Sequence, residues 1–281
     1  MPSFIQTVAC NDQPNLIKQT CTFISSNQGN ILEMEQYVDQ AEGIFFLRVS
    51  WETNLAITSE QVLHHYKHHM QIDMLSCNCY LKQDKIRMAV LVSKNDHCLF
   101  DIIMRYHNHE WPAVIPCVIS NHPDLGELCE KFSIPFKYIP INDDKLKQEK
   151  KVLATLHENN IELVVLARYM QILTGNFVNA YANNIINIHH SFLPAFVGAK
   201  PYHQAFEKGV KMIGATSHYV TEDLDQGPII AQDIKMVNHS HTIGDLIHMG
   251  KDVEKKVLSH AITAHLERKV LVFNNKTIVF R

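Results

Sequence analysis

Two apolar runs decide the fold of this chain: Met-Ala-Val-Leu-Val at residues 88–92 and Leu-Val-Val-Leu-Ala at residues 163–167. Continuous apolar runs are typical of strands covered on both faces, as in a parallel sheet with helices on each side. We therefore expect strands at Ile86–Val92 and Ile161–Ala167 in an α/β sheet.

The same rhythm of apolar strands and amphipathic helices continues from Lys85 to the C-terminus. It predicts further strands at Ala113–Ser120, Ile185–Ile188, Met212–Val220 and Pro228–Val237, the last two antiparallel. A long helix at about Thr242–Arg268 and a hairpin turning at Asn274–Asn275 follow. This is a Rossmann-like, mostly parallel sheet, in which ligands bind beyond the carboxyl ends of the strands. That rule points to the residues after Ile188.

The first eighty residues follow a different order. Strands are expected at Phe4–Cys10, Asn30–Val38, Gly43–Trp51 and Cys77–Lys82, with helices at Leu16–Ser26 and Ser59–Met74. Ser59 is the expected N-cap of the second helix. The order βαββαβ is ferredoxin-like. Because 281 residues exceed the usual size of one domain, we expect two, at residues 1–82 and 85–281.

Composition narrows the class of partner. The net charge of −3, with acidic and basic residues interspersed, gives no basis for binding nucleic acid or an anionic membrane. No apolar run reaches the length of a membrane span, and the N-terminus lacks the features of a signal peptide. Seven scattered cysteines indicate reduced thiols. The sequence thus predicts a cytoplasmic protein that acts on a small molecule.

Polar side chains gather at the end of one predicted strand. Asn187 and His189 are two residues apart on a strand, so both project to the same face, while His190 should point away. About forty residues later, the Gly-Pro turn after Asp225 can fold a carboxylate back to meet the histidine. Taken singly, each of these residues is more often structural, for example as a turn residue.

Two motifs at this spacing carry a resemblance. The pattern N-I-H-x-S-x-L-P at 187–194, followed by L-D-x-G-P-I at 224–229, resembles the folate-dependent formyltransferases and hydrolases, over the whole of Lys85–Arg281. The longer string Ile185–Ala199, with Pro-Tyr-His-Gln after it at 201–204, resembles the formyltetrahydrofolate deformylase branch in particular. The first eighty residues resemble an ACT domain, which the transformylases lack.

The resemblance implies hydrolysis of 10-formyltetrahydrofolate to formate and tetrahydrofolate, in one-carbon and purine metabolism. Asn187 and a protonated His189 would stabilise the tetrahedral oxyanion, and Asp225 would orient the imidazole and take a proton from the attacking water. No metal, and no cofactor beyond the folate substrate, is implied. The family's folate-binding and pocket-lining positions correspond here to Arg168, Met170, Gln171, Leu173, His218 and Gly227. Many relatives have arginine where Gln171 stands.

Two alternatives stay open: a glycinamide ribonucleotide transformylase, and a regulator that binds folate without catalysis. A glycinamide ribonucleotide transformylase would have a glycine-rich phosphate loop after its first strand, whereas the turn Ser93–Cys98 has no glycine and carries Asp96; His97 would help to fill the acceptor volume. A methionyl-tRNA formyltransferase is disfavoured by the N-terminal position of the extra domain and the absence of a basic stripe. The second alternative is a regulator that binds folate through its second domain without catalysis.

The N-terminal part also suggests an effector. ACT domains usually pair side by side and hold a small amino acid at the interface, so a homo-oligomer, dimer or tetramer, is expected. Their first turn reads D-x-x-G, and here Asn15 replaces the glycine of Asp12–Asn15, a residue that tolerates left-handed backbone. The alternative role of Asp12 is to cap the helix. His64, His65, His68 and His69 fit a solvated helix face better than a metal site.

Overall fold

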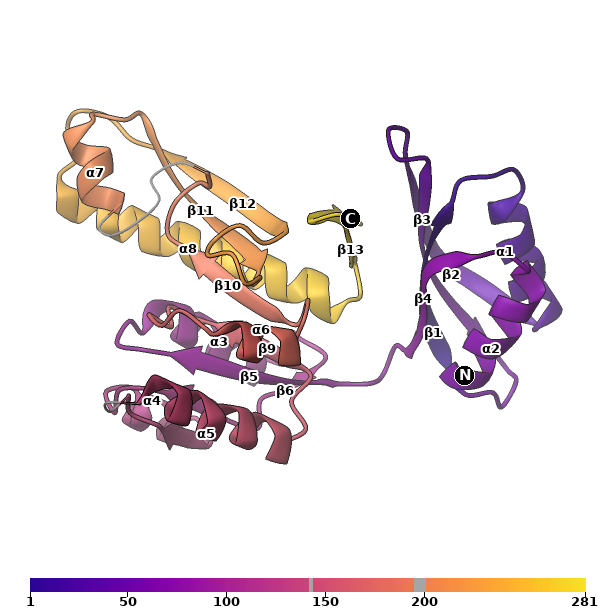
Figure 1. The fold of residues 1–281 in the computed structure, drawn as a ribbon, viewed down its shortest axis with the longest axis horizontal. Coiled ribbons are helices and arrows are strands. Elements are labelled where there is room, and N and C mark those ends of the chain that lie inside the picture. Colours follow the sequence, from indigo (N-terminus) through magenta and orange to yellow (C-terminus); the bar gives the residue numbers. More distant parts are fainter. Residues whose placement is uncertain (142–143, 195–200) are drawn as a thin grey trace. The chain divides into compact units, whose positions relative to one another are not determined.

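The computed structural model of the chain describes residues 1–141, 144–194 and 201–281. Contacts between these residues divide them into two units, which Figure 1 draws in sequence colours. The first unit consists of Met1–Asp84 with Arg268–Leu271 and Ile278–Arg281. The second consists of Lys85–Glu267 with Val272–Thr277.

The first unit is a four-stranded antiparallel sheet with two helices on one face. The strands are β1 (Ser3–Asn11), β2 (Gly29–Asp39), β3 (Ile44–Thr53) and β4 (Met74–Leu81), in the order β2-β3-β1-β4. The helices are α1 (Leu16–Ser26) and α2 (Ser59–Met70). Alternate strand residues such as Phe4, Leu47 and Trp51 pack against Phe23 and Tyr66 of the helices. The predicted order βαββαβ is confirmed.

Helix boundaries in this unit differ from the sequence-based expectation at two points. The N-cap of α2 is Thr58, not Ser59, because Thr58 and Gln61 form a reciprocal capping box, with Thr58 Oγ1 accepting from the Gln61 amide at 3.3 Å. The helix ends four residues earlier than predicted, since Gln71 takes a left-handed φ of 50°. Asn15 is left-handed as expected, with φ 73°, and is itself the N-cap residue of α1, so Asp12 is not.

The second unit is built on an eight-stranded sheet. Its strands are β5 (Ile86–Val92), β6 (Ala113–Val114), β7 (Val118–Ser120), β8 (Phe136–Tyr138), β9 (Leu163–Leu166), β10 (Ile185–His189), β11 (Met212–Tyr219) and β12 (Ile229–Met236). Pairing is parallel from β10 through β9, β5 and β7 to β8, and antiparallel for β11 and β12. The predicted mostly parallel α/β sheet is confirmed.

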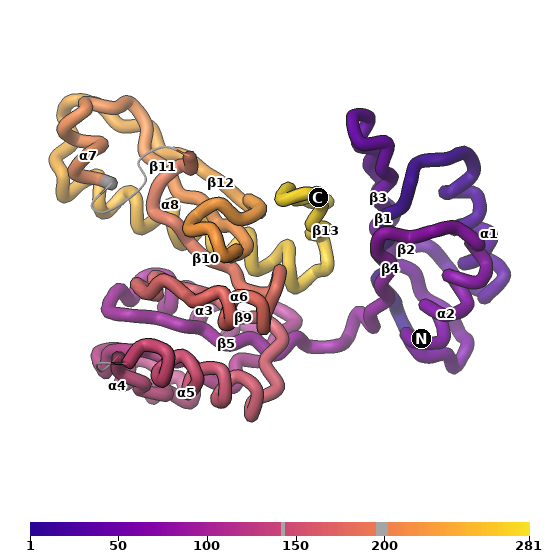
Figure 2. The backbone as a smooth tube through the Cα atoms, viewed as in Figure 1, coloured from indigo at the N-terminus to yellow at the C-terminus, as the bar shows by residue number. Residues whose placement is uncertain are grey.

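Helices complete this unit: α3 (His97–His107), α4 (Gly126–Lys131), α5 (Lys145–Glu158), α6 (Gly175–Ala180), α7 (Pro201–Glu207) and α8 (Ile243–Leu266). The long helix α8 lies against β10, β11 and β12 and also contacts α3, as the path of the backbone in Figure 2 shows. Residues of β5 and β9 such as Val90 and Val164 are fully buried, as expected for strands covered on both faces. A two-stranded hairpin, β13 (Val270–Phe273) and β14 (Lys276–Val279), turns at the expected asparagines.

The structure has two strands where the sequence predicted one. Ala113–Ser120 forms β6 and β7 with a break between them that contains Pro116, a residue without an amide hydrogen for the sheet. The short β8 lacks a clear apolar signal and was not predicted. Within the described residues, no helix has both the length and the apolar character needed to cross a membrane.

Candidate active site

A cavity of about 620 Å³ opens at the carboxyl ends of the parallel strands, entirely within the second unit. Its wall is formed by residues after β5, by the ends of β9, β10 and β11 with the residues that follow them, and by one side of α7 and α8. This is the place that the rule for open α/β sheets predicts.

The three residues singled out from the sequence meet in this cavity. Asn187 and His189 both line it. His189 Nδ1 lies 3.2 Å from Asp225 Oδ2. His189 Nε2 is buried and has no hydrogen-bond partner among the described residues. The imidazole is therefore held on one side by a carboxylate while its other nitrogen is left for a bound molecule.

His218 orients the amide of Asn187. Asn187 and His218 are opposite one another in the β10–β11 pair, and their Nδ2 and Nε2 atoms lie 3.3 Å apart. His218 Nδ1 lies 2.9 Å from the Tyr219 carbonyl; because a carbonyl only accepts, Nδ1 carries the hydrogen. Nε2 faces the Asn187 amide and also Asp225 Oδ1, which lies 3.7 Å from it, so His218 fixes the way the amide faces.

The loop after β11 is shaped by a close approach of two backbones. A Cβ added to Gly227 would lie 1.7 Å from the Tyr219 carbonyl oxygen, so only glycine fits. Two residues earlier, Asp225 takes a left-handed φ of 56°. Such a conformation costs a non-glycine residue of order 1–3 kcal/mol. The loop thus directs the carboxylate of Asp225 toward β10.

Asp225 is ionised in this environment. Its side chain is only 14% exposed. Burial alone would raise the pKa of Asp225, but hydrogen bonds from His189 and His218 and the charges of both rings outweigh burial and lower that pKa well below its ordinary value. A lowered pKa means that the charged carboxylate is favoured at neutral pH.

His190 does not point away from the site, contrary to the expectation from strand alternation. It lines the cavity because β10 ends at His189, so the two-residue repeat no longer applies at position 190. Its ring lies 5.1 Å from that of His189 and 6.2 Å from that of Tyr202. Burial and the positive charge of Arg168 lower the pKa of His190 to about 4, so this ring is neutral at pH 7.

The segment 168–173, which follows β9, forms one wall of the cavity. All six residues line it, among them the expected Arg168, Met170, Gln171 and Leu173. Arg168 is left-handed, with φ 62°. Ser93 Oγ accepts from the Met170 amide at 3.0 Å. Met170 and the Ile172 side chain are more than half exposed, so the segment offers both backbone groups and an apolar edge.

Two positions differ from their expected place. Gly227, expected to contact substrate, does not line the cavity, and its role is the close approach to Tyr219. Asp96, expected to repel a phosphate from the acceptor side, is exposed and does not line the cavity either. His97 and Asn95 of the same turn do. The last part of the recognised motif, residues 195–200, lies outside the described residues.

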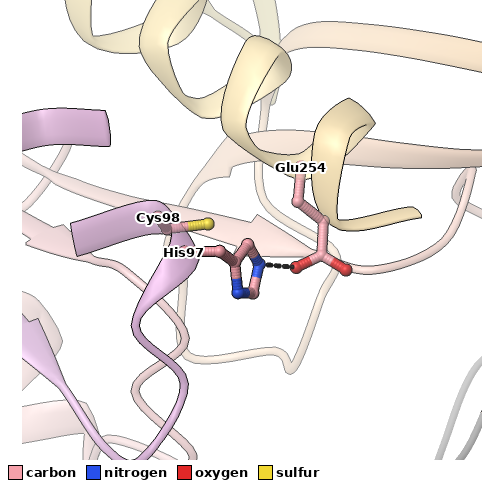
Figure 3. Close-up of side chains that lie close together, drawn as sticks. All are labelled: His97, Cys98 and Glu254. Atoms are coloured by element: carbon pink, nitrogen blue, oxygen red, sulfur yellow. Dashed lines mark hydrogen bonds and ion pairs between the residues drawn. The ribbon is translucent and has the colours of Figure 1, made fainter. Parts of the chain in front are cut away.

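Sequence reasoning missed a fully buried carboxylate in the wall, that of Glu254. Figure 3 shows it reaching from α8 toward His97 at the start of α3, with Cys98 beside them. Glu254 stands on the apolar side of its helix, between the buried Val253 and Val257. An acidic residue among buried apolar positions is the sequence feature that could have indicated this carboxylate. His97 Nε2 donates to it at 2.8 Å and Tyr202 at 2.6 Å.

The ligand atoms of His97, Cys98 and Glu254 lie within 4.8 Å of one another, a spacing that a metal ion can use. One observation disfavours a cation. Arg168 Nε lies 3.5 Å from the same carboxylate, and a positive charge there repels a divalent ion. We describe these groups as a buried ion-pair cluster.

Comparison with known proteins identifies the relatives of this chain. A family model described as formyl transferase matches residues 86–262. A formyltetrahydrofolate deformylase of Synechocystis sp. is 46% identical over 275 residues, which are 97% of this chain and 96% of that protein. The chain belongs to the formyltetrahydrofolate deformylase family. A solved family member from Pseudomonas syringae pv. tomato has a TM-score of 0.96 and 40% identity, covering 100% of this chain and 95% of that one.

The deformylase family accounts for more of the chain than the transformylases do. A solved glycinamide ribonucleotide transformylase from Symbiobacterium toebii reaches a TM-score of 0.67 at 28% identity and covers 95% of its own length, but only 70% of this chain. The deformylase structure extends over both units described above.

Proposed function

We propose that this protein hydrolyses 10-formyltetrahydrofolate to formate and tetrahydrofolate, as part of one-carbon and purine metabolism. The proposed reaction uses no cofactor beyond the folate substrate. The observation that carries the proposal is the pairing of His189 with the ionised Asp225 at 3.2 Å, in a cavity that also presents the amide of Asn187. Membership of the deformylase family supports water as the formyl acceptor.

The groups have separate roles in the proposed reaction. Water attacks the formyl carbon. As the bond between the water oxygen and that carbon forms, the carbonyl oxygen becomes an oxyanion. Asn187 Nδ2 and the protonated Nε2 of His189 donate to that oxyanion; one such donor is typically worth about 10²–10³ in rate. The carboxylate of Asp225 takes the proton of the water as the new bond forms. Collapse breaks the carbon–N10 bond, N10 receives the proton, and formate leaves.

The folate is proposed to lie along the segment 168–173, with backbone groups holding the pterin. Arg168, Met170, Gln171 and Leu173 line the cavity there. Backbone recognition does not depend on an arginine at position 171, so the glutamine in this chain is compatible with it. His218 is proposed to act through Asn187, whose amide it orients.

One assay tests the function. Purified protein is mixed with 10-formyltetrahydrofolate, and formate is measured with and without millimolar glycinamide ribonucleotide. We expect formate release that the ribonucleotide neither slows nor diverts, because the turn Ser93–Cys98 offers no glycine for a phosphate and the charged Glu254 stands in the wall beside it. Formylated ribonucleotide at a comparable rate would favour a transformylase. Folate binding without formate release would favour the non-catalytic regulator.

We also propose that the first unit is an ACT domain, centred on residues 1–82, which binds a small amino acid and supports a homo-oligomer. Its antiparallel βαββαβ sheet fits that domain, and a cavity of about 230 Å³ lies at the turn before α1, lined among others by Asp12, Asn15 and Gln36. Small amino acids are titrated against wild type and Asp12→Asn, with the surface change Glu60→Gln as control. An effect on formate release that Asp12→Asn leaves unaltered would place the effector elsewhere.

A further inference from the structure

The buried carboxylate of Glu254 is unusual because it takes part in no proposed chemical step. Its side chain is 1% exposed. Burial alone would raise the pKa of Glu254, but the hydrogen bond from His97 and the charge of Arg168 outweigh it, so the pKa is lowered. An ionised carboxylate at this depth costs several kcal/mol unless its partners are well placed. The fold supplies them from three separate elements.

The partners saturate the carboxylate. His97 donates to Oε2 at 2.8 Å and Tyr202 donates to Oε1 at 2.6 Å. Arg168 Nε lies 3.5 Å from Oε2, too far for a strong hydrogen bond but close enough for charge pairing. With both oxygens occupied by its own chain, Glu254 has little capacity left to bind a substrate group directly. Its effect must pass through the residues it holds.

Arg168 is the partner that leads to the substrate. It begins the segment 168–173 and stands there in a left-handed conformation, φ 62°, which is uncommon for a non-glycine residue. Further along, Ser93 fixes the Met170 amide, and Glu149 accepts from the amide of Thr174 at 3.1 Å. The middle and the end of the segment thus have their own anchors, and the pairing with Glu254 anchors its beginning.

We propose that Glu254 is a positioning residue for folate recognition: by pairing with Arg168 it holds the start of the segment 168–173 in the shape that presents its backbone to the pterin. This rests on the proposed function of that segment. A segment that shifts loses contacts to substrate and transition state alike, so the effect falls on binding and KM rather than on kcat. Misplacement of about 1 Å can cost up to about 100-fold.

The experiment compares Glu254→Gln, Arg168→Gln and the double variant with wild type. Steady-state rates give KM and kcat for 10-formyltetrahydrofolate, and direct titration gives the affinity for tetrahydrofolate. We expect each single variant to weaken tetrahydrofolate binding and raise KM about tenfold, with kcat within about threefold. The double variant should lose no more than a single one, because the two residues act as a pair. Asp252→Asn, the same charge change on the exposed side of α8, is the control and should leave both values unchanged.

Three results would overturn the proposal: unchanged tetrahydrofolate affinity in both single variants, a loss confined to kcat, or multiplicative losses in the double variant. If Glu254→Gln does not fold, Arg168→Lys against Arg168→Gln decides, because lysine keeps the charge and should retain affinity within about threefold of wild type; equal losses would refute the pairing. Wild-type protein that binds tetrahydrofolate without releasing formate would refute the proposed function and leave this comparison intact.

Discussion

Replacing Asp225 by asparagine is the most direct test of the proposed chemistry. The amide has nearly the shape of the carboxylate and keeps an oxygen that can accept from His189 Nδ1. In the wild-type chain this nitrogen lies 3.2 Å from Asp225 Oδ2. What the variant loses is the negative charge and the ability to take a proton. Because Asp225 stands in a left-handed conformation that asparagine also tolerates, the loop should keep its path.

The size of the effect follows from the distance. Two unit charges 3.2 Å apart attract by about 5 kcal/mol at an effective dielectric constant of about 20. Since about 1.4 kcal/mol corresponds to tenfold in rate, losing this support for the protonated His189 sets an upper limit of nearly 10⁴. Loss of a general base alone typically costs about 10²–10⁴. We therefore expect kcat to fall by at least about 100-fold, with a small change in KM.

The assay is formate release under saturating 10-formyltetrahydrofolate, with tetrahydrofolate binding and thermal unfolding measured on the same preparation. Binding and unfolding should stay close to those of wild type, which separates lost chemistry from lost structure. A well-folded Asp225→Asn protein that kept more than about a tenth of the wild-type kcat would show that Asp225 is not the acid–base group of this site.

Further predictions concern the same site. His189→Ala and Asn187→Ala should each lower kcat far more than folate affinity, and the double variant should lose much less than the product of the two, since both donate to one oxyanion; multiplicative losses in kcat would indicate that one is structural. The lowered pKa values of Asp225 and Glu254 stabilise the fold above the ordinary carboxyl pKa of about 4, and this contribution is lost as pH falls below that value. Denaturant unfolding at pH 6 and pH 3 should therefore show a smaller acid loss in Asp225→Asn than in wild type. Gly227→Ala should lower both thermal stability and kcat, because its Cβ would collide with the Tyr219 carbonyl; wild-type values would contradict the close approach.

The sequence predicted what depends on local pattern. Apolar runs such as Ile86–Val92 identified buried strands, here with the observed bounds. The two-residue repeat placed Asn187 and His189 on one face, and the Gly-Pro turn brought Asp225 back toward them. Each inference used a periodicity or a turn that is fixed within a few residues. The two-residue repeat gave a wrong prediction beyond the end of the strand. Because β10 ends at His189, the ring of His190 lies in the cavity wall and does not point away from it.

Contacts between distant elements were beyond the sequence. Glu254 is separated from His97 by 157 residues and from Tyr202 by 52, and no local rule brings such positions together. For the same reason the carboxylate facing the cavity was misassigned. Asp96 lies in the expected turn but is exposed, whereas the buried carboxylate comes from α8, which only the packing of α8 against α3 places beside that turn.

Asp225 and Glu254, two of the carboxylates that line the cavity, differ in a way that assigns their roles. Both are ionised, because in each the donors outweigh the effect of burial on the pKa. Glu254 has a donor from its own chain on each oxygen and is 1% exposed, so a reacting proton has no place to arrive. Asp225 is 14% exposed, so its carboxylate can still be reached from the cavity. Charge alone therefore does not identify the acid–base residue, whereas the remaining access to the carboxylate does. This distinction requires opposite kinetic signatures, with loss of Asp225 acting on kcat and loss of Glu254 on KM. If both changes acted on the same constant, accessibility would not separate catalysis from positioning in this site.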